Sequence, residues 1–527
     1  MLSSVSADAW DAVQALKGAL GAANQQSYGN EQLEYIAKTF GISSGFQPYD
    51  LSAAAYYVQP VFSPFRNRIP RLHLQGKNME CKTVVSADSG NASILAAEGA
   101  LGNAVTTAFA DVVTNFKTYK LASDPVTFEA LYAAVAKAGD FNVDARAVAA
   151  KMLLEAFFVK EERLMLGGVG SQSQITTTNI SPDNGFNFTI GGLVGAAPAG
   201  GSLTASSSGG TIPASVTVYV KYTAVTPMGI EAGMPTTGGA IPYATSNAGE
   251  SLPETAELSV AVGTGSTNSV TFTPPAPSSG GAFQWPIVAW KVYVSTASGA
   301  EKYYGYTTGA PLAITSIPST GASVPSSDNS AITSISGGTG SSVEGSFNGI
   351  LPWLYGLGTG ATLYGVNGAI SLSNITAQLA NAFQSAFADP DAMWANATDI
   401  NTITNLFVGP NAGLPYWFAA SQGQAQGNLT AGFSVTNAMN PVTRKMLPLN
   451  VHAYMPQGTL IALTDQLPSW YVGNNVPDVW AWGGSMDYLE IDFQPTANKP
   501  LWQSSINCMG ALHCFLPSQN IVWYGIS

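Results

Sequence analysis

The stretch that decides the fold is Ala145–Gly168, with the sequence ARAVAAKMLLEAFFVKEERLMLGG. Its pattern predicts one helix over Asp144–Leu166, because apolar residues recur at helical spacing and Lys151 stands four residues before Glu155. The glycine pair that follows is a typical helix end. Charged residues are concentrated in this helix, so we expect it to be a structural backbone of the fold.

The rest of the chain is poor in charge. Of its 527 residues only 10% are Asp, Glu, Lys or Arg, against roughly 25% in an ordinary soluble domain. Hydrophobic residues still make up 46%, which argues against disorder, since disordered chains combine low hydrophobicity with high charge. So much uncharged surface favours a protein that pairs with other copies of itself. The length alone suggests about three or four domains.

The sign of the charge and the cysteine count exclude further classes. A net charge of −12 argues against a surface built to bind DNA or an anionic membrane over a wide area. Three cysteines, Cys81, Cys508 and Cys514, form no disulfide framework and fit a reducing cytosol. The first 23 residues lack the basic start of a signal peptide, and no apolar run approaches the roughly 18 residues of a membrane span.

Before the long helix, the sequence predicts a helical arm and an extended one. Helical spacing marks residues 10–20 and 30–40, and a short helix is expected at 127–138. Alternating apolar residues over Leu72–Val85 and Val112–Leu121 predict two paired strands, and the Gly, Ala, Asn and Ser between them predict a flexible tip. We therefore expect a long two-stranded arm.

After the helix the composition changes. Residues 169–344 are rich in Gly, Ser, Thr and Pro, and short alternating strands with frequent turns predict an inserted β-sandwich between Gly-rich linkers at 195–210 and 321–342. The expected strands are centred on Val216–Tyr222, Val270–Phe272, Trp290–Val294, Tyr304–Tyr306 and Leu312–Ile314. A helix is then expected over Ser373–Ala388, with Ile375, Leu379, Phe383 and Phe387 on one face, and another over Asp399–Phe407. Residues 431–527 are predicted to be rich in strands.

The sequence contains only weak matches to the patterns of catalytic, metal-binding or phosphate-binding sites. Gly41–Gly45 matches the G-x-S-x-G pattern around a serine nucleophile, Ser43, but a helix precedes it where a strand is required. His73, His452, His513 and the cysteines lack the close pairs of a zinc site, so buried free thiols are favoured. The glycine-rich segments lack the order of elements that surrounds a phosphate loop. We predict no catalytic, cofactor or metal site and no enzymatic activity.

One basic run stands out: Arg66, Arg68, Arg71, His73 and Lys77. It could meet a nucleic-acid phosphate, but we favour contact with the acidic surface of a neighbouring subunit.

The order of these elements resembles that of the major capsid proteins of tailed double-stranded DNA bacteriophages, which have the Hong Kong 97-type fold. The resemblance is carried by Pro64–Leu72, by the EERLMLGG end of the long helix (161–168), by GSFNGI (345–350) and by NPVTRKMLPLNVHAYMPQGTLIAL (440–463). It implies an α+β fold with an N-terminal arm, an extended loop over a neighbouring subunit, a peripheral domain with a long spine helix, and an axial domain.

On this sequence the resemblance implies an N-terminal arm at 1–59, an extended loop and peripheral domain at 60–168, an axial domain at 345–480, and C-terminal strands at 481–527 that return to the peripheral domain. The sandwich at 169–344 is similar to an immunoglobulin or fibronectin type III module, and such modules are often displayed on capsid exteriors.

The function implied is that of a major capsid protein, which assembles into pentamers and hexamers around packaged DNA in the host cytoplasm. Its partners would be itself, a portal, a separate scaffolding protein and decoration proteins, with no membrane. The candidate subunit-contact residues are Arg66, Arg68, Arg71, Lys77, Lys82, Glu155, Glu161, Glu162 and Arg163. The alternatives are an adhesin that binds carbohydrate through Tyr303, Tyr304 and Trp285, and, on the Ser43 match alone, a hydrolase.

Overall fold

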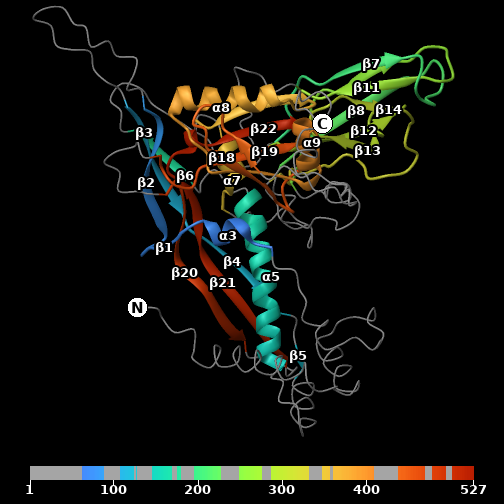
Figure 1. Cartoon of the computed structure of the whole chain (residues 1–527). Coiled ribbons are helices and arrows are strands. Elements are labelled where there is room, and N and C mark those ends of the chain that lie inside the picture. Colours follow the sequence, from blue (N-terminus) through green and yellow to red (C-terminus); the bar gives the residue numbers. More distant parts are fainter. Residues whose placement is uncertain are drawn as a thin grey trace, which may run out of the picture. The chain divides into compact units, whose positions relative to one another are not determined.

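The structure, a computed structural model, describes residues 62–87, 107–123, 126–127, 145–168, 175–179, 195–226, 249–275, 287–330, 347–356, 360–408, 437–468, 478–493 and 501–526. Within them the fold is mixed α and β, with more strand than helix (Figure 1). The helices expected in the first 60 residues, the tip of the arm and all of the helix expected at 127–138 except Thr127 lie outside the described residues. Thr127 forms the short strand β5 (Val126–Thr127).

The long helix is confirmed as α5 (Ala145–Gly167), and the expected Lys151–Glu155 pair forms at 3.7 Å. It ends where its backbone meets another segment. The Gly168 carbonyl accepts a hydrogen bond from the Gly349 N–H at 2.8 Å, and a Cβ on Gly168 would stand 2.5 Å from the Phe347 carbonyl oxygen. Glycine is required here because the two backbones touch.

The chain divides into two compact units. Three elements contribute residues to both units: α5, β20 (Trp480–Phe493) and β21 (Leu501–Cys514). The first unit contains residues 1–66, 118–162 and 484–510. In it, β21 lies between β20 and β4 (Lys117–Ala122), and β5 pairs with the start of β21.

In the second unit, the expected arm is a ribbon of β2 (Asn78–Ala87) and β3 (Thr107–Asn115), paired antiparallel. Three details differ from the prediction. The first strand is interrupted by a bend at Gly76, whose φ is 113°, so residues 71–73 form a separate strand β1 (Arg71–His73) beside β20. The second is interrupted at Phe116, which is buried. A third strand, β6 (Ile175–Asn179), pairs with β3.

A six-stranded sheet also belongs to the second unit, in the order β15-β22-β19-β16-β18-β17. Its strands are β15 (Thr362–Gly368), β16 (Ala392–Ala395), β17 (Asn437–Met439), β18 (Met446–Val451), β19 (Thr459–Leu463) and β22 (Ile521–Ile526). The return of residues 481–527 to a peripheral domain stays a prediction, and among the C-terminal strands β22 belongs to this six-stranded sheet. This strand pairs with β15 and β19 because its apolar residues, among them Trp523, enter their core.

Helices α8 (Leu372–Ala386) and α9 (Ala397–Val408) confirm the two predicted helices and share that core. The short helix α7 (Ile350–Tyr355) is entirely buried. The buried face of α8 consists of Ile375, Leu379 and Ala382. The periodicity of the sequence predicted that Phe387 would extend this buried face, but it does not. It caps the helix with a φ of 50° and is 47% exposed.

The described strands of residues 195–330 form two sheets around one core, and the five predicted strands are among them. One sheet has the order β10-β8-β12-β13, with β9 beside β8, and the other the order β14-β11-β7. The strands are β7 (Ser202–Ser206), β8 (Thr217–Val225), β9 (Glu250–Pro253), β10 (Leu258–Ala261), β11 (Ser269–Thr273), β12 (Ala289–Ser295), β13 (Lys302–Thr307) and β14 (Leu312–Ile314). We refer to residues 195–330 as the β module.

Candidate functional site

Arg66, the first residue of the basic run, is held within its own unit. Its Nε donates to Glu161 Oε2 at 3.1 Å and to the Tyr488 hydroxyl at 2.8 Å, and its guanidinium lies 3.8 Å from the centre of the Phe158 ring. Tyr119 and Tyr488 both donate to Glu161. No pattern in the sequence marks these two tyrosines as partners of Glu161. Tyr488 sits at a backbone irregularity with a φ of 44°.

Glu162 is fully buried and fixes the chain that enters the basic run. Its carboxylate accepts the backbone N–H groups of Phe65 and Arg66 at 2.9 and 2.8 Å, at the start of the short helix α3 (Pro64–Arg68). A carboxylate satisfies such unpaired N–H groups well. The nominated residues Arg66, Glu161 and Glu162 therefore interact inside the chain.

Five other nominated residues are described with their side chains, and one of them, Glu155, pairs with Lys151 on α5. Arg68 pairs with Asp465, the Arg71 guanidinium lies 3.9 Å from the Trp482 ring centre, and the Arg163 guanidinium lies 4.6 Å from that of Tyr454. Lys77 is exposed. Lys82 lies on β2, and its side chain is outside the described part of the structure. Contact of any nominated residue with another subunit stays a prediction.

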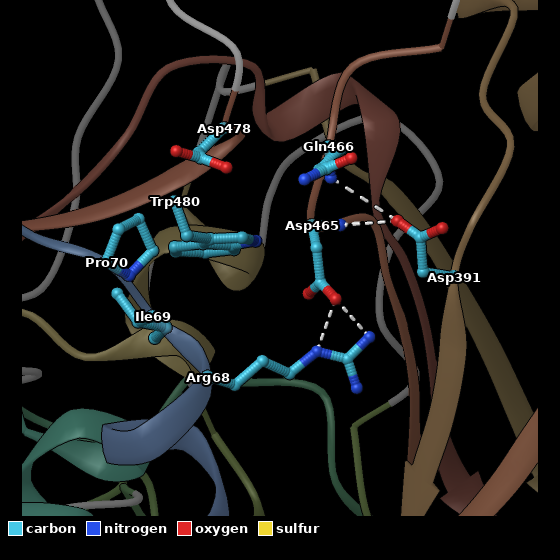
Figure 2. Close-up of a pocket in the computed structure, with 8 residues that line it drawn as sticks. All are labelled: Arg68, Ile69, Pro70, Asp391, Asp465, Gln466, Asp478 and Trp480. Carbon is cyan, nitrogen blue, oxygen red and sulfur yellow. Dashed lines mark hydrogen bonds and ion pairs between the residues drawn. The ribbon is translucent and has the colours of Figure 1, made fainter.

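A pocket of about 410 Å³ opens beside Arg68 (Figure 2). It is lined by Arg68, Ile69, Pro70, Asp391, Asp465, Gln466, Asp478 and Trp480. Burial raises the pKa of Asp465 above its ordinary value, and the ion pair with Arg68 opposes that shift. Asp391 accepts the backbone N–H of Asp465 at 2.7 Å. Asp478 has no side-chain partner among the described residues.

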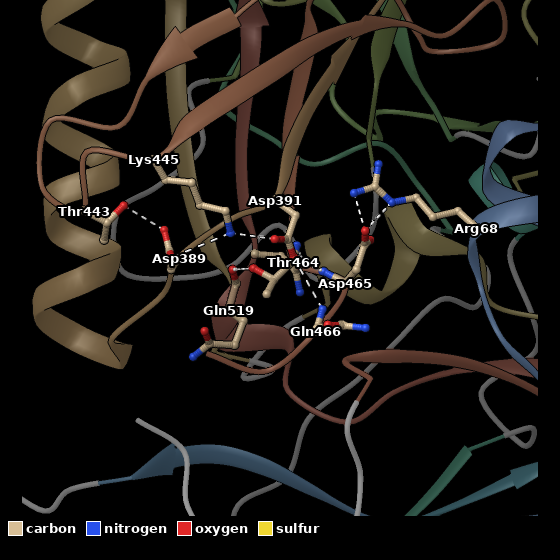
Figure 3. Close-up of polar contacts among 10 residues, drawn as sticks. Arg68, Asp389, Asp391, Thr443, Lys445, Thr464, Asp465, Gln466 and Gln519 are labelled. Carbon is tan, nitrogen blue, oxygen red and sulfur yellow. Dashed lines mark hydrogen bonds and ion pairs between the residues drawn. The ribbon is translucent and has the colours of Figure 1, made fainter. Parts of the chain in front are cut away.

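Polar contacts continue from this pocket to the turn between β17 and β18 (Figure 3). Lys445 Nζ lies 2.6 Å from Asp391 and 3.7 Å from Asp389, and the Thr443 hydroxyl donates to Asp389 at 2.8 Å. These contacts tie the turn to the segment between α8 and β16.

The side chains of this pocket could bind a charged group. Its lining contains carboxylates, one guanidinium and an indole, but no Ser, Cys or His. Throughout the described part of the chain, no group of three or more His, Cys, Asp or Glu side chains could hold a metal ion. Likewise, no described helix is long and apolar enough to cross a membrane. Ser43 lies outside the described residues.

His513 is buried at the root of the ribbon. Its Nε2 lies 3.4 Å from the Thr83 hydroxyl on β2, and its Nδ1 lies 3.4 Å from the Thr114 hydroxyl on β3. Burial lowers the pKa of His513 to about 3, so the ring is neutral. Cys508 and Cys514 are free and buried, which confirms the prediction for these two thiols. The side chain of Cys81 is outside the described residues.

The β module contains a buried ion pair. Lys291 Nζ lies 2.8 Å from Glu250 Oε2, and Thr223 and Tyr293 both donate to Glu250 Oε1. On its surface, Tyr304 uses its hydroxyl internally, to bond the Ala313 carbonyl and the Thr315 N–H. Tyr303 packs against the Tyr293 ring, and Trp285 is outside the described residues. Tyr303 and Tyr304 thus have structural roles in the module.

No protein-family model and no curated protein sequence matches this chain. Solved structures do align with it. The capsid asymmetric unit of cyanophage A-1(L) aligns at 11% identity and a TM-score of 0.38, over 91% of this chain and 96% of that one. The capsid of the native GTA particle aligns at 10% identity and a TM-score of 0.34, over 91% and 100%.

The holo-SrpI encapsulin complex of Synechococcus elongatus PCC 7942 aligns at 13% identity and a TM-score of 0.22, over 33% of this chain. This chain spans 57% of the length of that protein.

Proposed function

We propose that this chain is the major capsid protein of a tailed double-stranded DNA bacteriophage, a structural subunit without catalysis that assembles into an icosahedral shell. The observation that carries the proposal is the order of the described elements. After α3 and β1 come a ribbon (β2 and β3), one 23-residue helix (α5) and the β module. Most of the six-stranded sheet with its helices follows, then the long strands β20 and β21, and finally β22. This is the order that the resemblance in the sequence implies.

The use of charge in the structure supports self-assembly. Arg66, Arg68, Glu161 and Glu162 interact inside the chain, so these charges are not available to keep neighbouring copies apart. Large apolar side chains are exposed instead, namely Leu72, Met152, Leu372, Phe387, Met439, Val442, Met446, Val451, Leu489 and Ile491. Many copies in a closed shell would bury such residues in several small contacts each.

The partners follow from this role. The subunits would form pentamers and hexamers, with a portal at one vertex, a separate scaffolding protein during assembly and decoration proteins on the outside. The net charge of −12 would limit adhesion of the packaged DNA to the inner wall. The protein would assemble in the host cytoplasm and become part of the virion.

We further propose that the β module is an inserted, immunoglobulin-like domain displayed outside the shell. Its two ends are joined at one point, since the Gly195 N–H donates to the Asp328 carboxylate at 2.6 Å. The flanking chain also leaves and returns at one point, where Gly168 meets Gly349. Such adjacent ends are typical of a domain that can be inserted without disturbing its host.

Electron microscopy of the purified full-length protein tests the shell. Closed particles, pentamers or hexamers are the expected result. Trimers, fibres or a protein that stays monomeric at high concentration would refute the proposal.

Deletion of the β module tests the insertion. A variant in which a short Gly-Ser linker replaces residues 195–330 should still form particles, with less density on their outer surface. If the variant still gives the circular dichroism spectrum of a folded protein but does not assemble, the module is part of the lattice.

A further inference from the structure

The hairpin of β17 and β18 ends in an exposed apolar surface. Met439 and Met446 face each other across the two strands and are 58% and 57% exposed, and Val442 in the turn is 38% exposed. β17 is also the last strand of its sheet, so one side of its backbone is unpaired within the described chain. Long, exposed apolar side chains on an edge strand favour contact with another chain.

The turn of this hairpin exposes one positively charged side chain, that of Arg444. Arg444 is exposed, and its side chain has no ion pair or hydrogen bond among the described residues. Its backbone is in the left-handed region, with a φ of 59°, between two backbone hydrogen bonds of 2.8 Å that join Asn440 to Arg444 and Lys445. Because Lys445 and Thr443 are fixed to Asp391 and Asp389, the turn is ordered before any partner arrives.

The acidic pocket offers a complementary surface. Its carboxylates Asp391 and Asp465 already have cationic partners, Lys445 and Arg68, whereas Asp478 has none in the described chain. Asp478 lies near the Trp480 ring, and Ile69 and Pro70 supply apolar lining (Figure 2). A guanidinium next to a carboxylate and an indole ring is a favourable combination.

We propose that the β17–β18 hairpin binds a second copy of this chain, with Arg444 entering the Asp478 pocket of that copy and the two methionines packing at its edge. The proposal rests on the capsid function and names one contact between its subunits. Hairpin and pocket are different surfaces, so the contact is head-to-tail and can repeat around a ring.

The exposed apolar side chains cover on the order of a few hundred Å², less than the roughly 800 Å² per partner that a stable dimer needs. We therefore expect the contact to act within an assembly rather than to hold a dimer alone.

Charge reversal in the full-length protein tests this contact. Arg444→Glu should raise the concentration needed for assembly by roughly tenfold, because a close interfacial charge pair is lost and a repulsion replaces it. The double variant Arg444→Glu with Asp478→Arg should recover most of the wild-type assembly. Lys302→Glu, on β13 of the β module, is the control with the same change in net charge.

Analytical ultracentrifugation over a range of concentrations gives the readout. Arg444→Asn is a second variant, since asparagine tolerates the left-handed backbone and removes the charge without reversing it. The proposal fails if wild type assembles and both Arg444 variants assemble equally well, or if the double variant is not rescued. A wild-type chain that never associates would refute the capsid function as well, so the two failures can be told apart.

Discussion

Acid should loosen the root of the β2–β3 ribbon through His513. The neutral ring sits between Thr83 and Thr114, against the rings of Trp353 and Phe515. Burial lowers the pKa of His513 from 6.5 to about 3. The unfolded chain therefore takes up a proton near pH 6.5 that the folded chain refuses until about pH 3, so stability is lost as the pH falls through this window.

The shift in the pKa of His513 sets the loss of stability at up to about 5 kcal/mol at the acid end of this window. His513→Leu removes the titration and fills a similar apolar space. It gives up two long hydrogen bonds to the threonine hydroxyls, each worth about 1 kcal/mol or less. The variant should be slightly less stable than wild type at neutral pH and more stable in acid.

Hydrogen exchange followed by mass spectrometry measures this locally, in peptides that cover residues 78–87 and 107–115. Wild type and variant are compared at the same pH, which cancels the intrinsic pH dependence of exchange. The difference in protection should change sign between neutral and acid conditions. A difference that stays constant with pH would show that His513 is not the acid-sensitive group and would refute this reasoning.

Three further changes test other parts of the fold. Lys291→Met should destabilise the β module by about 3–5 kcal/mol, because Glu250 would keep a buried charge without its cation. Hydrogen exchange in residues 217–225 and 289–295 should therefore increase. Unchanged protection there would show that the ion pair is dispensable. Gly349→Ala should cost about 1–3 kcal/mol, since its Cβ would stand 2.6 Å from the Met165 carbonyl oxygen. Gly263→Ala is its control, with no atom nearer than 3.9 Å, and equal melting temperatures would contradict the tight contact. Burial raises the pKa of Asp399 to about 6, so its contribution to stability falls as the pH rises from about 4 to about 6. Asp399→Asn should flatten the plot of unfolding free energy against pH over this range. Parallel plots for wild type and variant would argue against a raised pKa.

Elements with a local signature could be predicted from the sequence. The helical spacing of residues 145–167 was enough for α5, and the alternation of residues 217–225 and 289–295 was enough for β8 and β12. Periodicity reports which face of a segment is apolar, and that property is set by near neighbours in the chain. The predictions were less accurate where a bend interrupts a pattern, as Gly76 does in the ribbon, or where a helix ends early, as at Phe387.

Apart from the i,i+4 pair of Lys151 and Glu155, the partners of the charged side chains were decided by the tertiary structure. Arg66 meets Glu161 across 95 residues and Tyr488 across 422, and Arg68 meets Asp465 across 397. No local spacing encodes such pairs, because the cost of burying a charge is met only when the folded chain brings the two groups together. The sequence by itself established a charge-poor protein suited to assembly. Only the folded chain decided which charges are used internally and left Arg444 and Asp478 available for a partner.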